Sequence, residues 1–109
     1  MIRNSIATLT IFGMASFVTP SVAQDVDNGR KLARKCSACH GKQGVSRDPE
    51  VPILAGQHAF YLEKVLKDYR DGRREDRRMT LIVKPLEDED ISDLAAWFAS
   101  FKITVEAPE

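Results

Sequence analysis

Cysteine and histidine are scarce in this chain, and their scarcity narrows the chemistry open to it. The 109 residues include two cysteines and two histidines, and three of these four stand together as Cys36, Cys39 and His40. A disulfide between the cysteines would close a loop around only two residues and add little stability. A closed zinc site needs four protein ligands, and only His58 is left to complete one. Neither a structural disulfide nor a zinc site therefore accounts well for the cysteine pair.

An excess of charge of either sign is also missing. The sequence has 16 Lys and Arg residues against 16 Asp and Glu residues, which gives a formal net charge of zero. Nucleic-acid-binding domains usually carry a clear basic excess, and no segment has the basic amphipathic pattern of a membrane-surface helix. We expect neither nucleic acid nor a membrane surface as a partner.

Long apolar runs are limited to the first residues. Residues 6–18 are uncharged and mostly apolar, but they fall short of the roughly 20 residues of a membrane-spanning helix. They follow a start that carries Arg3, and small residues precede Ala23, which is the order of a secretory signal peptide. We predict a signal peptide at 1–23, with an uncleaved anchor as the alternative. The mature chain, 24–109, would then be one periplasmic domain without a membrane span and with a formal charge of −1, since Arg3 is lost.

Strand-like alternation is weak, whereas apolar residues recur at helical spacing in three stretches. These patterns predict helices at 27–38, 57–69 and 88–101. The connections between them, 41–56 and 71–85, are each about fifteen residues long, which is unusual in a small domain unless a loop encloses something. The sequence therefore predicts an all-α domain folded around a bulky cofactor.

The pattern Cys36-x-x-Cys39-His40 is typical of covalent haem c attachment. Two thiols about one helical turn apart can form thioethers with the two vinyl groups of one porphyrin, and the next residue then lies under the iron. A thioredoxin-type dithiol shares the cysteine spacing, but it requires a βαβ setting that this sequence lacks. We interpret Cys36 and Cys39 as the covalent attachment points of haem c and His40 as an axial ligand of the iron.

The second axial ligand should be a methionine or a histidine. After cleavage the chain retains one methionine, Met79, and one further histidine, His58. Met79 is an apolar side chain within a stretch rich in arginine, where a surface role would be unexpected. His58 falls away from the apolar face predicted for 57–69. We therefore favour Met79, with His58 or an open position as alternatives.

The mature sequence resembles class I c-type cytochromes over 24–101. The shared motifs are "CSACHGKQG", "PILAGQHAFYL", "YRDGR", the single Met79 and "LEDEDISDLAAWFASF". The nearest patterns are the haem domains of cytochrome c4 and c553-type proteins and the cytochrome subunit of flavocytochrome c sulfide dehydrogenases. The resemblance implies three main helices wrapped around one haem. A cytochrome c4 has two such motifs and this chain has one, so it is not a complete cytochrome c4.

The same resemblance implies roles for further residues. The carbonyl group of Pro52 would accept a hydrogen bond from the His40 ring and so orient it. Gly29 would allow the first helix to cross closely over the last, near Leu94, Trp97 and Phe98. The haem pocket would be lined by Tyr61, Leu66 and Tyr69.

Together these patterns predict an electron carrier rather than an enzyme, because no nucleophile, base or carboxylate pair converges on a catalytic site. The alternatives are the haem subunit of a flavoprotein dehydrogenase, such as one that oxidises sulfide, and a haem sensor or enzyme with a labile sixth ligand. Redox proteins are the expected partners. Five arginines precede or flank Met79, and we hypothesise that they steer an acidic partner to the haem edge; the alternative is that they pair within the chain. They are Arg70, Arg73, Arg74, Arg77 and Arg78.

Overall fold

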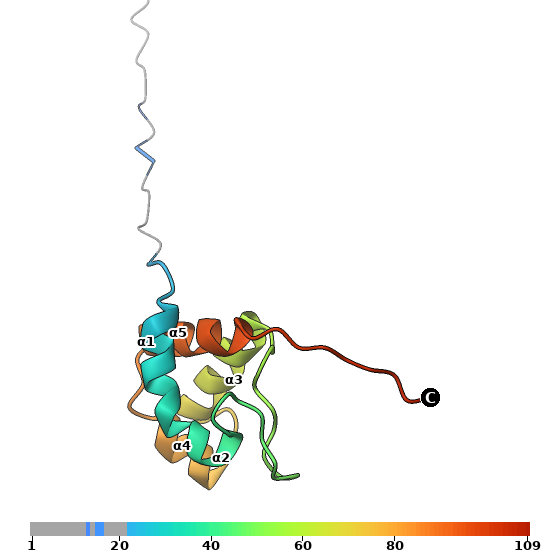
Figure 1. Ribbon diagram of the computed structural model, residues 1–109. Coiled ribbons are helices and arrows are strands. Elements are labelled where there is room, and N and C mark those ends of the chain that lie inside the picture. The colour runs from blue at the N-terminus through green and yellow to red at the C-terminus, as the bar shows by residue number, and fades with distance from the viewer. Residues whose placement is uncertain (1–12, 14, 17–21) are drawn as a thin grey trace, which may run out of the picture.

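The computed structural model describes residues 13, 15, 16 and 22–109, and within this part it is helical without any strand (Figure 1). The predicted signal peptide lies almost wholly outside the described residues. The elements are α1 (Val26–Leu32), a 3₁₀ turn η1 (Ala33–Lys35), α2 (Ser37–His40), α3 (Ala59–Arg70), α4 (Arg77–Val83) and α5 (Asp88–Ala99). The all-α prediction is confirmed. No helix in the described part of the chain has the length and apolar character to cross a bilayer.

The first predicted helix, 27–38, is interrupted in the structure. Asp25 caps α1 by accepting a hydrogen bond from the Asn28 backbone N–H. After Leu32 the chain tightens into the turn η1, and α2 then continues to His40. Periodicity predicted one continuous helix because a single 3₁₀ turn leaves the spacing of apolar residues almost unchanged.

The two longer helices lie close to their predicted positions. α3 occupies 59–70 where 57–69 was predicted, and α5 occupies 88–99 where 88–101 was predicted. The start of α5 is strongly acidic, and the Asp90 carboxylate accepts a hydrogen bond from the Glu87 backbone N–H at 3.0 Å. Negative charge at this end also suits the helix dipole.

The prediction that 71–85 is a loop is wrong, because this segment contains the seven-residue helix α4. Asp76 caps it by accepting hydrogen bonds from the backbone N–H groups of Arg78 and Met79. A helix of two turns is too short to show a repeated apolar pattern. The many charged residues around Asp76 also prevented its recognition as a helix cap.

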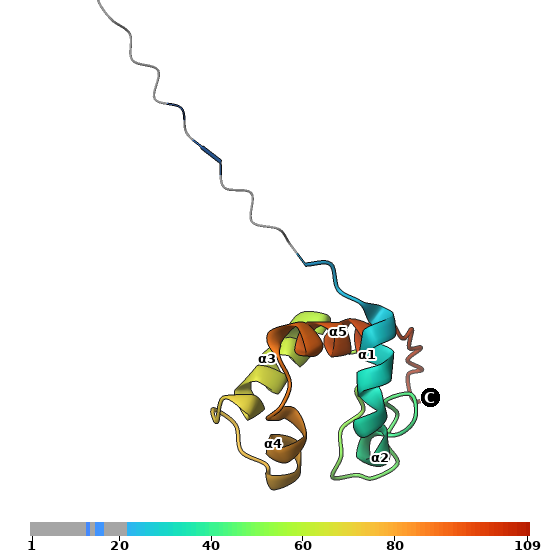
Figure 2. The same ribbon diagram turned by 90° about the vertical axis from the view of Figure 1, so that its left-hand side faces the viewer.

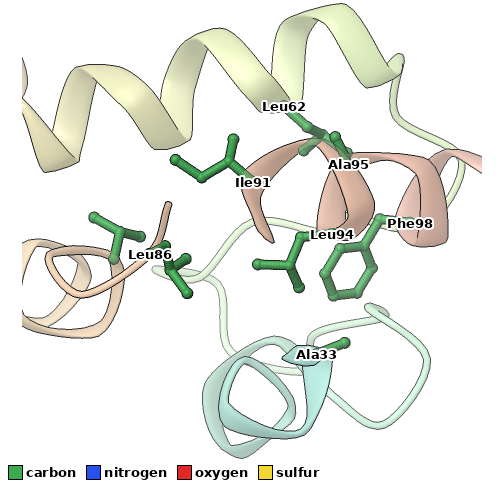
Figure 3. Close-up of a cluster of buried hydrophobic side chains, with 8 residues drawn as sticks. Ala33, Leu62, Leu86, Ile91, Leu94, Ala95 and Phe98 are labelled. Atoms are coloured by element: carbon green, nitrogen blue, oxygen red, sulfur yellow. The ribbon is translucent and has the colours of Figure 1, made fainter. Parts of the chain in front are cut away.

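The core lies mainly along one face of α5, which packs against both α1 and α3 (Figure 3). Ile91 and Ala95 are fully buried, and Leu94 and Phe98 nearly so. The remaining members of the core cluster are Ala33, Leu62, Val83 and Leu86. These residues tie the first helical segment, α3, α4 and α5 into one unit.

The closest helix crossing is at Gly29. A Cβ atom there would lie 2.0 Å from the carbonyl oxygen of Asp93 and 3.0 Å from the Cβ of Trp97. The predicted crossing is therefore present, and the atoms nearest to Gly29 belong to Asp93 and to Trp97, one of the three residues predicted there. Beside it the Asp93 carboxylate, only 3% exposed, accepts hydrogen bonds from the Asp25 backbone N–H at 2.7 Å and from the Asn28 side chain at 2.8 Å. These contacts fix the angle at which α1 meets α5.

Candidate functional site

The predicted attachment residues lie on and just before α2. Cys36 is the residue that precedes this short helix, and Cys39 and His40 lie within it. Hydrogen bonds from the backbone N–H groups of Cys39 and His40 to the Cys36 carbonyl close a single helical turn. Cys36 is half-buried, Cys39 is exposed, and both are free thiols. This turn presents two thiols one turn apart, as two thioethers to one porphyrin require.

Burial affects the chemistry of the first thiol. The pKa of the Cys36 thiol is raised to about 11, mainly by burial and further by the neighbouring Cys39, while Lys35 opposes the shift. In its free form this thiol is therefore protonated at neutral pH and is a weak nucleophile.

The His40 ring is buried, with 5% of the residue exposed, and its tautomer follows from one contact. Its Nδ1 atom lies 2.8 Å from the carbonyl oxygen of Pro52. A carbonyl oxygen only accepts, so Nδ1 carries the hydrogen, and in the neutral ring Nε2 has a lone pair. A neutral imidazole held in this way is a ready ligand for a metal.

The connection 41–56 brings Pro52 back beside His40. The backbone N–H groups of Leu54 and Ala55 both donate to the carbonyl of Gly44, at 2.7 and 3.1 Å. Gly44 has a φ of +74°, and a Cβ atom on it would come within 2.9 Å of the Phe98 ring. A glycine is therefore required for the loop to turn this close to α5.

A cavity of about 370 Å³ opens beside His40, and its size is typical of a cofactor site. It is enclosed by α2, the loop 41–56, α3, α4 and α5. Figure 2 shows α2 and α4 at the same end of the molecule, with α1 and α3 leading up to α5. Every predicted site residue lines this one cavity: Cys36, Cys39, His40, Pro52, Tyr61, Leu66, Tyr69 and Met79.

The helix α4 carries Met79 and places it in the cavity lining. The side chain is half-buried, and the Met79 backbone N–H is held by the Asp76 carboxylate at 3.0 Å. His58, the alternative ligand, is exposed at the start of α3 and does not line the cavity. Among the described residues no three His, Cys, Asp or Glu side chains gather as a metal site. Of the two candidates for the second iron ligand, Met79 and His58, only Met79 lines the cavity together with His40.

The arginines before Met79 divide into two groups. Arg70 pairs with Asp71 and Asp88 at 3.0 and 2.7 Å, and Arg73 pairs with Asp68 and Asp71 at 2.7 and 3.3 Å. These hydrogen bonds to carboxylates raise the pKa of both guanidinium groups. For these two arginines the structure favours pairing within the chain over partner steering.

The other arginines are not held in this way. Arg74 lies over the Tyr69 ring, 5.0 Å from its centroid. Arg78 has a single long contact of 3.9 Å with Asp76, and Arg77 is exposed. This second group remains available to a partner.

Sequence comparisons place the chain among known proteins. A family model described as cytochrome c matches residues 26–102. Cytochrome c4 of Pseudomonas aeruginosa is 41% identical over 105 residues, which cover 96% of this chain and 50% of that protein. Cytochrome c-554(548) of Halomonas halodenitrificans is 43% identical over 81 residues, which cover 72% of this chain and 98% of that protein. The chain spans about half the length of the cytochrome c4 relatives that it matches.

A solved structure agrees with the sequence comparisons. Reduced recombinant cytochrome c4 from Pseudomonas stutzeri superposes with a TM-score of 0.66 at 31% identity, over 75% of this chain and 53% of that one. The family match extends over most of the chain, and the thiols and histidine of its attachment motif face one cavity. The chain belongs to the cytochrome c family of electron carriers, with Cys36, Cys39 and His40 as its motif for covalent haem c.

Proposed function

We propose that the chain is an exported monohaem electron carrier in which His40 and Met79 are the axial ligands of the iron. One observation carries this proposal: His40, with its Nε2 lone pair free, and Met79 both line the cavity beside the two attachment thiols. The predicted signal peptide and the similarity to bacterial cytochromes c4 support a periplasmic location.

The bound haem would supply reversible one-electron chemistry between Fe(II) and Fe(III). The residues of the chain would hold it in one position. Cys36 and Cys39 would anchor one edge covalently, and Pro52 would keep the His40 ring in a fixed orientation and increase its donor strength. A ligand set that is retained in both oxidation states needs little rearrangement when an electron arrives or leaves.

The lining of the cavity would also tune the potential. Tyr61, Leu66 and Tyr69 come from one face of α3 and would exclude water from the ring. A low local dielectric disfavours the extra charge of the ferric state, and thioether ligation acts in the same direction. If His40 and Met79 both bind the iron, no position on it would remain for a substrate, which favours a carrier over an enzyme or a ligand sensor.

Substitution of Met79 by alanine tests this assignment. In the matured protein we expect haem to stay covalently attached, the methionine-to-iron charge-transfer band of the ferric form to disappear, and the reduction potential to fall. His58→Ala is the matched control and should leave both properties unchanged. If Met79→Ala retains the band and the potential, Met79 is not the ligand.

A further inference from the structure

Gln24 stands at the chain end that export would create. The predicted signal peptide ends at Ala23, so cleavage there leaves Gln24 as the first residue, with a free α-amino group. A glutamine in this position can cyclise to pyroglutamate: the α-amino nitrogen attacks the side-chain carbon Cδ, a lactam bond forms, and the bond from Cδ to Nε2 breaks. The side-chain nitrogen leaves as ammonia, and no oxidant, reductant or further reactant is consumed.

The structure holds the nitrogen that this reaction expels. Gln24 Nε2 donates to Glu63 Oε1 at 3.2 Å and to Ser92 Oγ at 3.1 Å. The Ser92 hydroxyl donates in turn to the same Glu63 oxygen at 3.2 Å, which closes a ring of three hydrogen bonds. The amide nitrogen has two hydrogens, so each has an acceptor, and one acceptor is a carboxylate. We refer to Gln24, Glu63 and Ser92 together as the N-terminal clamp.

The backbone beside Gln24 is held as well. The backbone N–H group of Asp25 donates to the Asp93 carboxylate at 2.7 Å, and Asp93 is almost completely buried. The side chain of Gln24 reaches α3 through Glu63 and α5 through Ser92. Gln24 is therefore fixed both through its amide and through the peptide group that follows it, although the residue is exposed.

Cyclisation and the N-terminal clamp exclude each other. Ring closure joins Cδ to the α-nitrogen and expels Nε2, so the product has no side-chain N–H group to donate to Glu63 or Ser92. Hydrogen bonds to a carboxylate are stronger than those between neutral groups, so the clamp stabilises the uncyclised form. The reaction has to start from the fraction of molecules in which Gln24 has left α3 and α5.

We propose that Gln24 is the mature N-terminus and that Glu63 and Ser92 protect it from cyclisation to pyroglutamate in the folded protein. The proposal rests on the export proposed above, but it is independent of the axial ligands, because none of the three clamp residues lines the haem cavity. Since ammonia is lost, a cyclised terminus cannot return to the clamp. The modification therefore accumulates in molecules whose N-terminal contact has opened.

Mass spectrometry of the matured, haem-containing protein tests this protection. The intact mass and the N-terminal peptide, followed during incubation at neutral pH, report the loss of one ammonia from Gln24. We expect the wild type to be isolated uncyclised, and Glu63→Ala with Ser92→Ala to lose ammonia about fivefold faster or more. Glu89→Ala with Ser100→Ala is the matched control and should keep the wild-type rate. It removes a carboxylate and a hydroxyl that form no hydrogen bond with Gln24 in the described part of the chain.

Ser92→Ala alone is a milder variant that should accelerate the reaction less than the double variant does. Wild-type protein that is isolated already cyclised, or that cyclises as fast as the double variant, would overturn the proposal. Equal acceleration by the control would also overturn it, and so would a mature chain that begins at another residue. The haem absorption spectrum and reduction potential should be the same in all these proteins, and they test the electron-carrier function separately.

Discussion

Enlarging Gly29 tests whether the crossing of α1 and α5 sets the frame that holds the haem site. These two helices have the most extensive contact in the fold. The carbonyl oxygen of Asp93 occupies the place where a side chain would begin, only 2.0 Å from a Cβ atom added to Gly29. The clashing atom belongs to the backbone of Asp93, so no change of side-chain rotamer can relieve the clash.

The loss of stability in Gly29→Ala can be estimated from how far α1 must move. Side-chain carbon atoms essentially never approach closer than 3.0 Å to such an atom, so α1 must move by about 1 Å in Gly29→Ala. Overpacking of this kind costs about 1–3 kcal/mol, while alanine in place of glycine within a helix returns roughly 0.5–1 kcal/mol. We expect a net loss of about 1–2 kcal/mol, and at least about twice that for Gly29→Leu.

Thermal unfolding of the ferric protein, followed by circular dichroism and haem absorbance, measures this loss. Each kcal/mol should lower the midpoint by roughly 4–8 °C in a domain of this size. Gly72 is the matched control, because it has a φ of +77° and open space around it. Alanine and leucine at Gly72 should cost about the same, roughly 1–2 kcal/mol, since only the left-handed backbone conformation is penalised. A Gly29→Leu variant no less stable than Gly29→Ala would refute the steric argument.

Two further predictions concern the carboxylates that fasten α1 and α4. Asp93→Ala should lower the free energy of unfolding, measured by chemical denaturation, by about 2–4 kcal/mol, because two N–H donors beside a buried site lose their acceptor. Asp93→Asn keeps one acceptor oxygen and should lower it less. Equal losses in the two variants would argue against the hydrogen bonds as the cause. The hydrogen bonds from Met79 and Arg78 lower the pKa of Asp76 below its usual 3.8, so its stabilising effect is present above pH 3.8 and is lost as pH falls through the lowered value. In the wild type the methionine charge-transfer band should therefore weaken as the pH falls through the pKa of Asp76. In Asp76→Ala the band should already be weaker at neutral pH and should show no loss at that pH. Identical acid titrations of the two proteins would contradict the role of the cap.

Periodicity in the sequence predicted those helices whose apolar stripe is long enough to repeat. The stripe from Ile91 to Phe98 located α5 to within two residues, since four apolar positions at helical spacing are hard to reconcile with a strand or a loop. The 3₁₀ turn at Ala33–Lys35, which interrupts the first helix, could not be predicted from the apolar pattern, for a physical reason. A 3₁₀ turn advances 120° per residue instead of 100°, so three residues rotate the following turn by about 60°. That rotation alters the direction of the attachment thiols while the apolar spacing remains almost unchanged.

The site was predictable where side-chain chemistry defines it. The cysteine spacing identified the attachment turn, and Met79 is the only methionine outside the predicted signal peptide. Pro52 contributes a backbone carbonyl, which any residue carries, so only resemblance to a family pointed to it.

The His40 side and the Met79 side of the site are stabilised by contacts of unequal strength. Damage to each side should therefore be detected by a different measurement. The His40 side is fastened by the α1–α5 crossing, the buried Asp93 and the contact with Pro52. The Met79 side rests on a seven-residue helix that is capped by one partly exposed carboxylate and anchored in the core through Val83. Because short, peripheral helices open locally at lower free energy than the core, damage at α4 should appear first in the ligand band of the iron. Damage at the crossing should appear in the ligand band and in global unfolding together, since α1 and α5 make the most extensive helix contact in the fold.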